Sequence, residues 1–309
     1  MTTLLVASGG GHLKQLRGLA DRFDIDDDRL WVTFDTGLSR SILQTDNVVF
    51  APYAHPHDIW GNLKDVVFAL KLFRKHKVSR VISTGANVAV CFLPFAWIFG
   101  AKAIYIETAT RTHELSLTGK LVDRLPRIKR YCQSPALANK RWTYAGSVFD
   151  GFEAKHRPLA NGVKSIVVTL GSNDSYGFDR LLKRVLEIVP PQVDVTWQTG
   201  KTDITIEGAH QSMSGDDLEA AMERADVVIA HAGTGSALSA LEAGKYPVLV
   251  IRRAKHHEHI DDHQELTAKR LSVANLALPV EADELTWQDI ETAGNWHVAF
   301  NAGYLPKLG

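Results

Sequence analysis

The sequence predicts an α/β protein made of two Rossmann-like domains, each with a doubly wound parallel sheet. Three observations support this prediction. Short apolar runs alternate with longer segments of mixed polarity, which is the pattern of repeated βα units. The length of 309 residues exceeds that of a typical single domain. A polar segment at 150–165, with Pro158 and two glycines, separates two rounds of the alternation.

The first round of alternation occupies the N-terminal half. Its strands are expected at TLLVA (3–7), LWVTF (30–34), NVVFA (47–51), RVIST (80–84) and AIYIE (103–107). The segments between these runs are expected to form helices that cover the sheet. We therefore assign residues 1–155 to an N-terminal domain.

The second round begins after the polar segment. Its strands are expected at SIVVTL (165–170), VDVTWQ (193–198), DVVIA (226–230), PVLVI (247–251) and VANLAL (273–278). Helices are expected at about 177–189 and 216–224, and from about Ser236 and residue 260 onward. We assign residues 156–309 to this domain and expect its tail, from Trp287, to return to the first domain.

Composition narrows the class of protein. Apolar residues at 45% and charged residues at 23% are typical of soluble globular proteins. A formal charge of zero gives no overall attraction to nucleic acid. Cys91 and Cys132 lack the spacing of a disulfide or zinc site. No signal peptide is expected, and the apolar window at 88–99 is too short to span a membrane and is interrupted by Pro94.

The loop HAGTGS, 231–236, indicates a phosphate site. It follows a predicted strand, and a helix starting at Ser236 would point backbone N–H groups and its positive dipole end at a ligand. The P-loop lysine is missing, which disfavours ATP hydrolysis, and SGGGH at 8–12 lacks the third glycine of a dinucleotide-binding loop. A plain βα turn with a capped helix is the alternative interpretation.

The cluster KHHEHIDDHQ, 255–264, follows the next strand and should lie at the same sheet edge as that loop. His259 and His263 are four residues apart and could share a helix face. However, Asp261 stands where an HExxH motif needs its second histidine. We therefore expect a polar, hydroxyl-rich ligand here and no metal.

These residues carry a family resemblance. HAGTGSALSALEAGKYPVLVIRR with EHIDDHQ, and also VTLGS (168–172) and WQTG (197–200), resemble the donor-binding domain of GT-B glycosyltransferases of family 28. The family includes MurG and the eukaryotic enzyme that adds the second N-acetylglucosamine to dolichol diphosphate. The N-terminal motifs SGGGHL (8–13), STGAN (83–87) and YIETATRTHELSLTGKL (105–121) resemble the membrane-recruiting partner subunit of that eukaryotic enzyme.

The chain thus resembles both subunits fused, in the order of MurG, and looks closest to bacterial exopolysaccharide enzymes. The resemblance covers about residues 3–275 and implies a GT-B fold, in which the two domains face each other across a cleft. It also implies a UDP-sugar as donor substrate and no cofactor.

The resemblance implies three groups of donor-site residues. The diphosphate would lie on His231, Gly233, Thr234, Gly235 and Ser236. The nucleotide would be bordered by Gly171, Ser172, Gln198 and Gly200, and the sugar by Glu258, His259, Asp262, His263 and Gln264. In MurG and many relatives a glutamate holds the ribose, but Ser239 occupies that position here. Glu242, one turn later, is the substitute candidate, unless it is merely an exposed helix residue.

For the reaction, the loop N–H groups and a protonatable His231 would stabilise the departing diphosphate without Mg²⁺. His12 is the candidate general base for the acceptor hydroxyl, with inversion at the anomeric carbon as the resemblance implies. Its alternative roles are to cap the following helix or to bind an acceptor phosphate. The acceptor-binding residues implied are Gly10, Gly11, Gly85, Asn87, Glu107, Arg111, Ser116 and Lys120.

A basic segment suggests where the acceptor resides. Asp123 is the one acidic residue among these cations: Lys120, Arg124, Arg127, Lys129, Arg130, Lys140 and Arg141. Together with the apolar window at 88–99, they suggest peripheral attachment of a cytoplasmic protein to the inner face of the plasma membrane. A solvated basic face is the alternative.

The sequence therefore favours an inverting, metal-independent transferase that moves a sugar from a UDP-sugar to a polyprenyl-diphosphate-linked saccharide, in polysaccharide or glycolipid biosynthesis. A UDP-sugar epimerase of the same fold would act on the donor without an acceptor. A non-catalytic scaffold that binds nucleotide sugars is a third possibility, because of Ser239.

Overall fold

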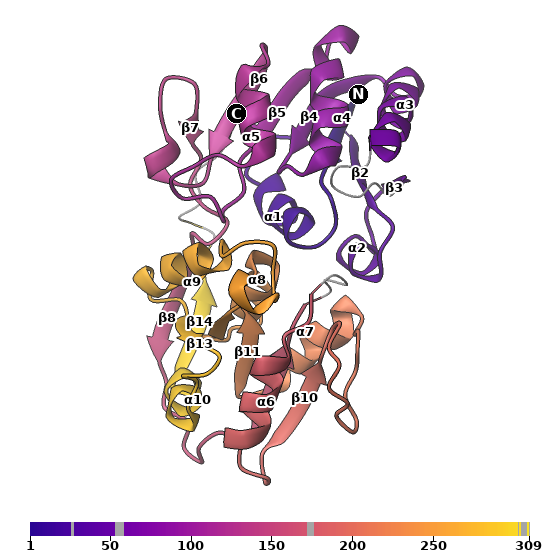
Figure 1. Cartoon of the computed structure of the whole chain (residues 1–309). Coiled ribbons are helices and arrows are strands. Elements are labelled where there is room, and N and C mark those ends of the chain that lie inside the picture. Colours follow the sequence, from indigo (N-terminus) through magenta and orange to yellow (C-terminus); the bar gives the residue numbers. More distant parts are fainter. Residues whose placement is uncertain (26–27, 53–58, 172–175, 302, 304–307, 309) are drawn as a thin grey trace. The chain divides into compact units, whose positions relative to one another are not determined.

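The structure of the chain is a computed structural model that describes residues 1–25, 28–52, 59–171, 176–301, 303 and 308. The chain divides into two units (Figure 1). The first comprises Met1–Asp150 and Leu305–Gly309, and the second Gly151–Tyr304. The division falls five residues before the predicted boundary at 155, because β8 (Phe152–His156) pairs with β14 (Trp296–Phe300) of the second unit.

The first unit is built on a seven-stranded parallel sheet in the order β3-β2-β1-β4-β5-β6-β7. Its strands are β1 (Thr2–Val6), β2 (Asp28–Phe34), β3 (Val48–Ala51), β4 (Val78–Ser83), β5 (Lys102–Ile106), β6 (Ile128–Cys132) and β7 (Thr143–Tyr144). The central strands are buried on both faces, which is why they appear in the sequence as nearly continuous apolar runs.

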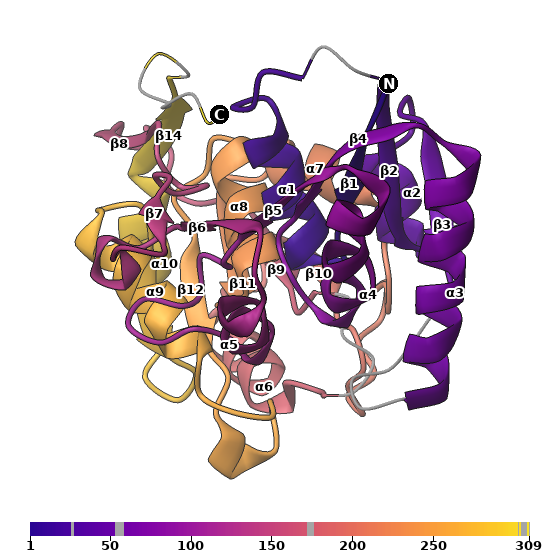
Figure 2. The ribbon, with the colours of Figure 1, turned by 90° about the horizontal axis from the view of Figure 1, so that it is seen from above.

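Helices connect these strands. They are α1 (Gly11–Ala20), α2 (Gly37–Ile42), α3 (Ile59–Lys75), α4 (Asn87–Ala96) and α5 (Leu117–Arg124). Figure 2 shows α3 beside α4, where the rings of Phe73 and Phe92 lie 6.3 Å apart. The apolar window at 88–99 forms α4 and a short 3₁₀ turn, and half of its side chains belong to the core.

The second unit contains a five-stranded parallel sheet in the order β10-β9-β11-β12-β13 and the antiparallel pair β8–β14. The sheet strands are β9 (Ser165–Thr169), β10 (Asp194–Gln198), β11 (Val227–His231), β12 (Val248–Ile251) and β13 (Leu278–Glu281). The helices are α6 (Asp179–Ile188), α7 (Gly215–Arg224), α8 (Thr234–Glu242), α9 (Gln264–Val273) and α10 (Trp287–Gly294).

Two predicted elements of this unit are corrected. The run VANLAL is not a strand, because α9 extends to Val273 and Asn275 then adopts a left-handed turn with φ of 53°. The last strand of the sheet begins at Leu278. The helix expected from about residue 260 begins at Gln264, after a 3₁₀ turn at Ala254–His256 and an irregular segment.

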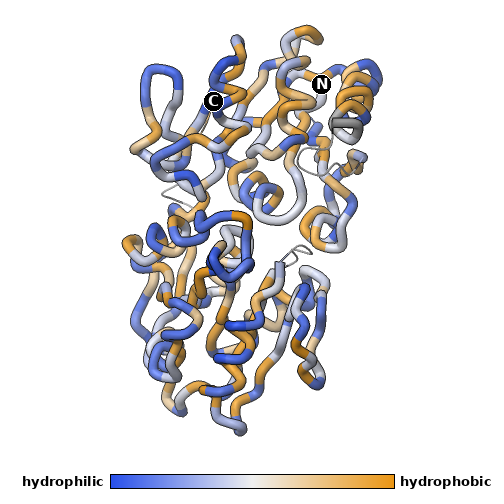
Figure 3. Tube along the Cα trace, in the orientation of Figure 1, coloured by the Kyte–Doolittle hydropathy of each residue, from blue (hydrophilic) through white to orange (hydrophobic). Residues whose placement is uncertain are grey.

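The strand order locates where each sheet can bind a ligand. It reverses direction between β1 and β4 in the first unit and between β9 and β11 in the second. Ligands of open parallel sheets bind at such points, outside the carboxyl ends of the strands. Figure 3 shows that the strands are largely hydrophobic and that polar colours concentrate in connecting segments. In the described part of the chain, no helix has the length and apolarity to span a membrane.

Candidate functional site

His231, the last residue of β11, lies between two glycine-containing loops. A Cβ atom on Gly171 would lie 2.5 Å from Cε1 of His231, and a Cβ atom on Gly233 would lie 2.4 Å from its Nε2. Gly171 also has a φ of +73°, which disfavours other residues. Both glycines therefore make room for the imidazole ring. The lack of side chains in these loops is thus explained by the ring as well as by a phosphate site.

The environment of His231 keeps its ring neutral. Burial lowers the pKa of His231 well below its ordinary value of 6.5, and the positive charge of Arg252 lowers it further. A hydrogen bond with the backbone of Thr169 opposes the shift but does not reverse it. Nδ1 of His231 lies 3.3 Å from Oγ of Ser236, with which it shares a hydrogen bond. In the unliganded protein, then, the ring of His231 favours its neutral form.

Helix α8 begins at Thr234, two residues before the predicted start at Ser236. Gly233 is its N-cap residue, and no side chain caps the helix. The N–H groups of the first turn have no partners within a helix. The hydroxyl of Thr234 is buried and has no hydrogen-bond partner among the described residues. Ser236 does not cap α8, as the sequence suggested, but contacts His231 from its first turn.

The ends of β9 and β10 are joined beside His231. The hydroxyl of Thr169 donates to Oε1 of Gln198, and the N–H of Gly171 donates to the Thr169 hydroxyl over 3.3 Å. A Cβ atom on Gly200 would lie 3.2 Å from the carbonyl oxygen of Gly171. The structure thus brings Gly171, Gln198 and Gly200 together at the edge where His231 ends its strand. Ser172 lies outside the described residues.

The proposed substitute for the ribose-binding glutamate lies far from this loop. Glu242 is the last residue of α8 and is exposed. Eight residues separate it from Thr234, so it lies about 12 Å along the helix axis from the N-terminus. Ser239 is partly buried in the middle of the helix. Glu242 therefore lies away from the diphosphate loop, and its contact with the ribose stays a prediction.

Glu258, which was expected to face the donor sugar, forms a buried ion pair instead. Both of its carboxylate oxygens accept hydrogen bonds from Arg180, over 3.0 Å each, and one also accepts from the N–H of Arg253 over 2.9 Å. A pocket of about 520 Å³ lies beside this pair and is lined by Lys183 and Lys201, among others. Glu258 therefore connects α6 to the segment after β12.

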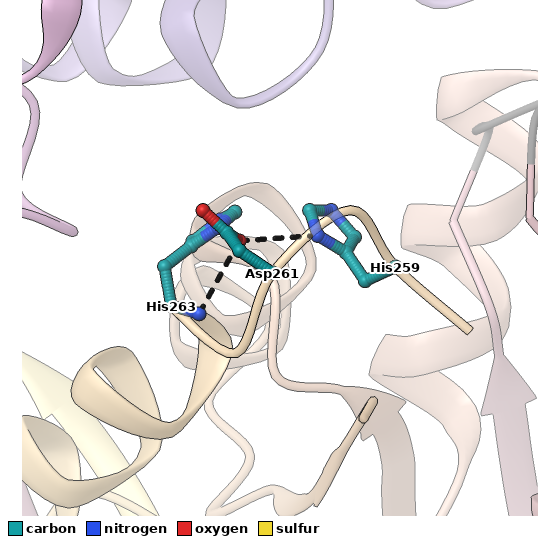
Figure 4. A group of neighbouring side chains, drawn as sticks. All are labelled: His259, Asp261 and His263. Atoms are coloured by element: carbon teal, nitrogen blue, oxygen red, sulfur yellow. Dashed lines mark hydrogen bonds and ion pairs between the residues drawn. The ribbon is translucent and has the colours of Figure 1, made fainter. Parts of the chain in front are cut away.

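Three side chains in the irregular segment between Glu258 and α9 have the arrangement of metal ligands. His259, Asp261 and His263 bring ligand atoms within 4.8 Å of one another, the one such group among the described residues. Figure 4 shows Asp261 between the two histidines, with one carboxylate oxygen in contact with the imidazole of His259 and with the backbone N–H of His263. The distance from this oxygen to Nδ1 of His259 is 3.4 Å, and Nδ1 of His263 hydrogen-bonds to it. The missing HExxH motif had led us to expect no metal here, and the sequence pointed to the two histidines but not to Asp261 as a third member of the group.

The two remaining sugar-site candidates differ in burial. Asp262 is exposed, and its Oδ1 accepts a hydrogen bond from the N–H of Ala254 over 2.8 Å. Gln264 is the first residue of α9 and is 3% exposed. Its Oε1 has no hydrogen-bond partner in the part of the chain that the structure describes. Of the two, Gln264 is thus better placed to bind a polar ligand, because its Oε1 still lacks a partner among the described residues.

In the first unit, His12 joins the loops after β1 and β4. Its Nδ1 lies 2.9 Å from the carbonyl oxygen of Thr84, and the Thr84 hydroxyl donates to the carbonyl of His12 over 2.8 Å. A carbonyl oxygen only accepts, so Nδ1 carries the proton and Nε2 is the basic nitrogen. His12 does not cap α1, because Gly10 is the N-cap residue and no side chain caps that helix.

The loop after β4 contains a strained residue. Ala86, the N-cap residue of α4, has φ of 65° and ψ of 179°, a region populated almost entirely by glycine. It lies between two predicted acceptor residues, Gly85 and Asn87. A Cβ atom on Gly85 would lie 3.4 Å from Cε1 of His12. Strain of this kind is concentrated at functional sites.

Glu107 is completely buried at the start of α5. Its carboxylate accepts hydrogen bonds from the N–H of Thr108 and from both the N–H and the hydroxyl of Ser116. Gly119 leaves space for it, since a Cβ atom there would lie 2.0 Å from its Oε2. Burial raises the pKa of Glu107, while these hydrogen bonds oppose the shift. Glu107 and Ser116, predicted as acceptor ligands, thus hold α5 in place.

The other predicted acceptor residues lie at several places near the carboxyl ends of the strands of the first unit. Gly10 and Gly11 begin α1, and Arg111 is close enough to Tyr105 to lower the pKa of its hydroxyl, although burial raises that pKa overall. Lys120 is exposed, and its Nζ lies 3.7 Å from a carboxylate oxygen of Glu114. The structure therefore does not bring Lys120 to the buried group around Glu107.

Sequence reasoning missed two residues that connect the loops of the first unit. The hydroxyl of Tyr105 lies 3.3 Å from both Glu107 and Ser116. Gln15 is 2% exposed on the apolar face of α1, and its Oε1 accepts from the N–H of Ala109 over 2.8 Å. Gln15 could have been found from the sequence, because it is a polar residue among the leucines of α1.

Comparison with known proteins gives the class. Residues 165–295 match the glycosyltransferase family 28 C-terminal domain. Subunit ALG13 of the UDP-N-acetylglucosamine transferase of Yarrowia lipolytica is 50% identical over 56 residues, which span 18% of this chain and 29% of that protein. The UDP-N-acetylglucosamine N-acetylmuramyl-(pentapeptide) pyrophosphoryl-undecaprenol N-acetylglucosamine transferase of Synechococcus sp. is 25% identical over 299 residues, covering 87% of this chain and 80% of that protein.

The crystal structure of Acinetobacter baumannii MurG matches with a TM-score of 0.56 and 19% identity, covering 94% of this chain and 88% of that one. The two parallel-sheet α/β domains and this likeness show that the chain has the GT-B fold. Residues 165–295 thus carry a family 28 glycosyltransferase C-terminal domain, and the chain is similar to MurG-like glycosyltransferases, a likeness that supports a hexosyl or N-acetylhexosaminyl transferase.

Proposed function

We propose that this enzyme transfers a sugar from a UDP-sugar to a polyprenyl-diphosphate-linked saccharide, with inversion at the anomeric carbon. The proposal depends most on one observation, the enclosed His231 beside the uncapped N-terminus of α8. Such a terminus can bind a diphosphate without a lysine. The family assignment supports a nucleotide-sugar donor, and two relatives are UDP-N-acetylglucosamine transferases by name.

The leaving diphosphate gains negative charge as the sugar departs. The N–H groups of α8 and the buried hydroxyl of Thr234 would stabilise this charge, each preorganised donor contributing about 3 kcal/mol. The bound anion would raise the pKa of His231 toward its ordinary range. His231 would then donate a hydrogen bond or a proton to the departing oxygen.

On the acceptor side, we propose His12 as the general base. Its proton is held on Nδ1 by the carbonyl of Thr84, so Nε2 is the nitrogen that can remove a proton from the acceptor hydroxyl. The hydrogen bonds between His12 and Thr84 orient the ring. The strained Ala86 and the enclosed Gly85 keep the neighbouring loop close to that ring.

We propose that transfer needs no divalent cation, because neutral donors and the helix dipole supply the positive potential. Within the cluster of His259, Asp261 and His263, the carboxylate of Asp261 already hydrogen-bonds to His263 and lies 3.4 Å from Nδ1 of His259. Excess EDTA should therefore leave the rate of transfer unchanged. Loss of activity on chelation, with recovery on adding Zn²⁺ or Mg²⁺, would contradict metal independence.

We further propose that the first unit attaches peripherally to the cytoplasmic face of the plasma membrane, where a lipid-linked acceptor resides. Leu117 and Leu121 on α5 are 74% and 49% exposed, beside the cations of the same segment. The guanidinium of Arg127 lies 4.9 Å from the ring of Trp97, which is itself exposed. Arg130 does not belong to this surface, because it donates to the carbonyls of Val122 and Leu125.

Histidine variants test the proposed reaction. His12→Ala should lower the transfer rate by about 100-fold or more, since a general base is lost, and leave UDP affinity unchanged. His231→Ala should lower both transfer and UDP affinity. His76→Ala is the control, because His76 precedes β4 at the opposite edge of the sheet. Transfer to a polyprenyl-diphosphate saccharide is measured with radiolabelled UDP-sugar, and undiminished turnover in His12→Ala and His231→Ala would refute the assignment.

A further inference from the structure

Arg252, the residue after β12, is a buried cation that neither the sequence motifs nor the proposed mechanism uses. Its side chain is 1% exposed. Nη2 donates to the carbonyl oxygen of Leu170 over 2.9 Å, and the guanidinium carbon lies 5.4 Å from the centroid of the Phe178 ring. Nε has no hydrogen-bond partner among the described residues. Arg252 is thus almost fully enclosed while only partly hydrogen-bonded.

The neighbouring carboxylates are bound to other arginines. Glu258 forms its bidentate pair with Arg180, while Glu281 and Glu265 pair with Arg253. Burial lowers the pKa of Arg252 to about 10, and the charge of Glu258 offsets this shift only in part. Arg252 is therefore still cationic at neutral pH, in an environment that disfavours an uncompensated charge.

Arg252 lies close to the ends of β9 and β11, and therefore close to the predicted diphosphate loop. Leu170 ends the run that contains β9, and His231 ends β11, so the guanidinium lies below the point where the strand order reverses. Its charge reaches the rings of both His231 and His259. The same point faces the uncapped N-terminus of α8. Two sources of positive potential therefore act on one location, and Glu258, which is itself paired with Arg180, balances the charge of Arg252 only in part.

We propose that Arg252 is the fixed positive charge of the donor site, which attracts and holds the diphosphate of the nucleotide sugar through space from beneath the loop 231–236. This inference rests on the proposed function. Arg252 is a positioning residue, because it is enclosed and acts on the anion through the electric field rather than by contact. A buried unit charge close to the diphosphate is expected to strengthen its binding by roughly tenfold to 100-fold. The bound anion in turn compensates the buried guanidinium.

The proposal makes a paired prediction for Arg252→Met. This variant should bind UDP at least about tenfold more weakly, while its urea midpoint in the absence of ligand should equal or exceed that of the wild type. Arg252→Lys, which retains the charge, should keep UDP affinity within about threefold of wild type. Affinity is measured by calorimetry and stability by urea unfolding of the full chain.

Arg253→Met is the matched control. It removes the same formal charge from the adjacent residue, but from a guanidinium paired with two carboxylates. It should lower the urea midpoint and leave UDP affinity unchanged. A purely structural role for Arg252 would produce this same pattern in Arg252→Met and would overturn the proposal. Failure of both Arg252→Met and Arg252→Gln to fold would also overturn it.

Inorganic pyrophosphate separates this inference from the proposed function. If the wild type binds pyrophosphate but not UDP, the nucleotide assignment fails, and the dependence on Arg252 is then tested with pyrophosphate alone. If the wild type binds UDP and Arg252→Met binds it equally well, the inference fails and the proposed function stands. If neither ligand binds, both fail.

Discussion

At the residue scale, the ring of His231 determines which side chains its neighbours can have. Gly171 and Gly233 come from different strand ends, yet both would place a Cβ atom within 2.5 Å of this ring. The ring is also neutral, because burial and Arg252 lower its pKa. Sequence analysis identified the histidine and both glycines, but it could not show that they contact one another, since 60 residues separate the two loops.

Gly233→Ala tests this steric relationship. The added methyl group clashes with Nε2 of His231, so we expect a loss of about 1–3 kcal/mol in the free energy of unfolding. In a His231→Ala background the clash is absent, and the same substitution should cost much less. A double-mutant cycle by urea unfolding measures the difference.

Gly37→Ala is the control for that cycle, because a Cβ atom at Gly37 meets nothing within 4 Å. It should change the free energy of unfolding by well under 1 kcal/mol. Equal losses for Gly233→Ala in both backgrounds would show that the histidine is not what excludes a side chain there.

At the element scale, the strands were predictable and the helix termini were not. Apolar runs identified β1, β2, β4, β5, β9, β11 and β12 because buried parallel strands are apolar on both faces. The start of α8 was placed two residues late, since Ser236 resembled a cap but contacts His231 instead. Likewise, Glu258 was interpreted as a ligand because nothing local reveals its pairing with Arg180, 78 residues away.

Helix α5 carries the membrane prediction. Leu117→Ser with Leu121→Ser removes two exposed apolar side chains without opening the core, so stability should stay within about 0.5 kcal/mol of wild type. Binding to vesicles containing anionic lipid should fall several-fold, because apolar burial and charge attraction act together at a membrane surface. Vesicle sedimentation measures this.

The matched change for this surface is Leu186→Ser, in a residue of α6 that is 51% exposed in the second unit. It should leave vesicle binding unaltered. If the α5 variant sediments with vesicles as well as the wild type does, the apolar residues of α5 are not a membrane contact.

At the scale of the whole molecule, the buried histidine makes stability depend on pH. The pKa of His231 is depressed in the folded state, so the unfolded chain binds a proton more readily below about pH 6.5. The stabilisation is fully present above that pH and is lost as the pH falls, by at most about 1.4 kcal/mol per pH unit for one group. His259, whose pKa burial also lowers, acts in the same direction.

His231→Gln removes one of these titrations. Between pH 7.5 and pH 5.5, the free energy of unfolding of the wild type should fall by about 1 kcal/mol more than that of the variant. Urea unfolding at the two pH values gives both differences. Identical losses in the two proteins would mean that His231 titrates normally in the folded state.

The domain organisation was also predictable in outline, because the alternation of apolar and mixed segments restarts after residue 165. The exact division was not, since β8 belongs to the second unit through its pairing with β14, about 140 residues later. Near the C-terminus, the N–H of Leu308 donates to the carbonyl of Arg22 in the first unit. Such long-range pairings leave no local pattern in the sequence.

The antiparallel pairing of β8 with β14 joins the first strand of the second unit to its last strand. A chain interrupted next to Gly151 would therefore leave that unit's hydrogen-bonded framework unbroken. Gene fission at this junction would give one polypeptide for each sheet, with Leu308, which pairs with Arg22 of the first unit, on the second polypeptide. The same architecture is thus compatible with one continuous polypeptide or with separately encoded halves.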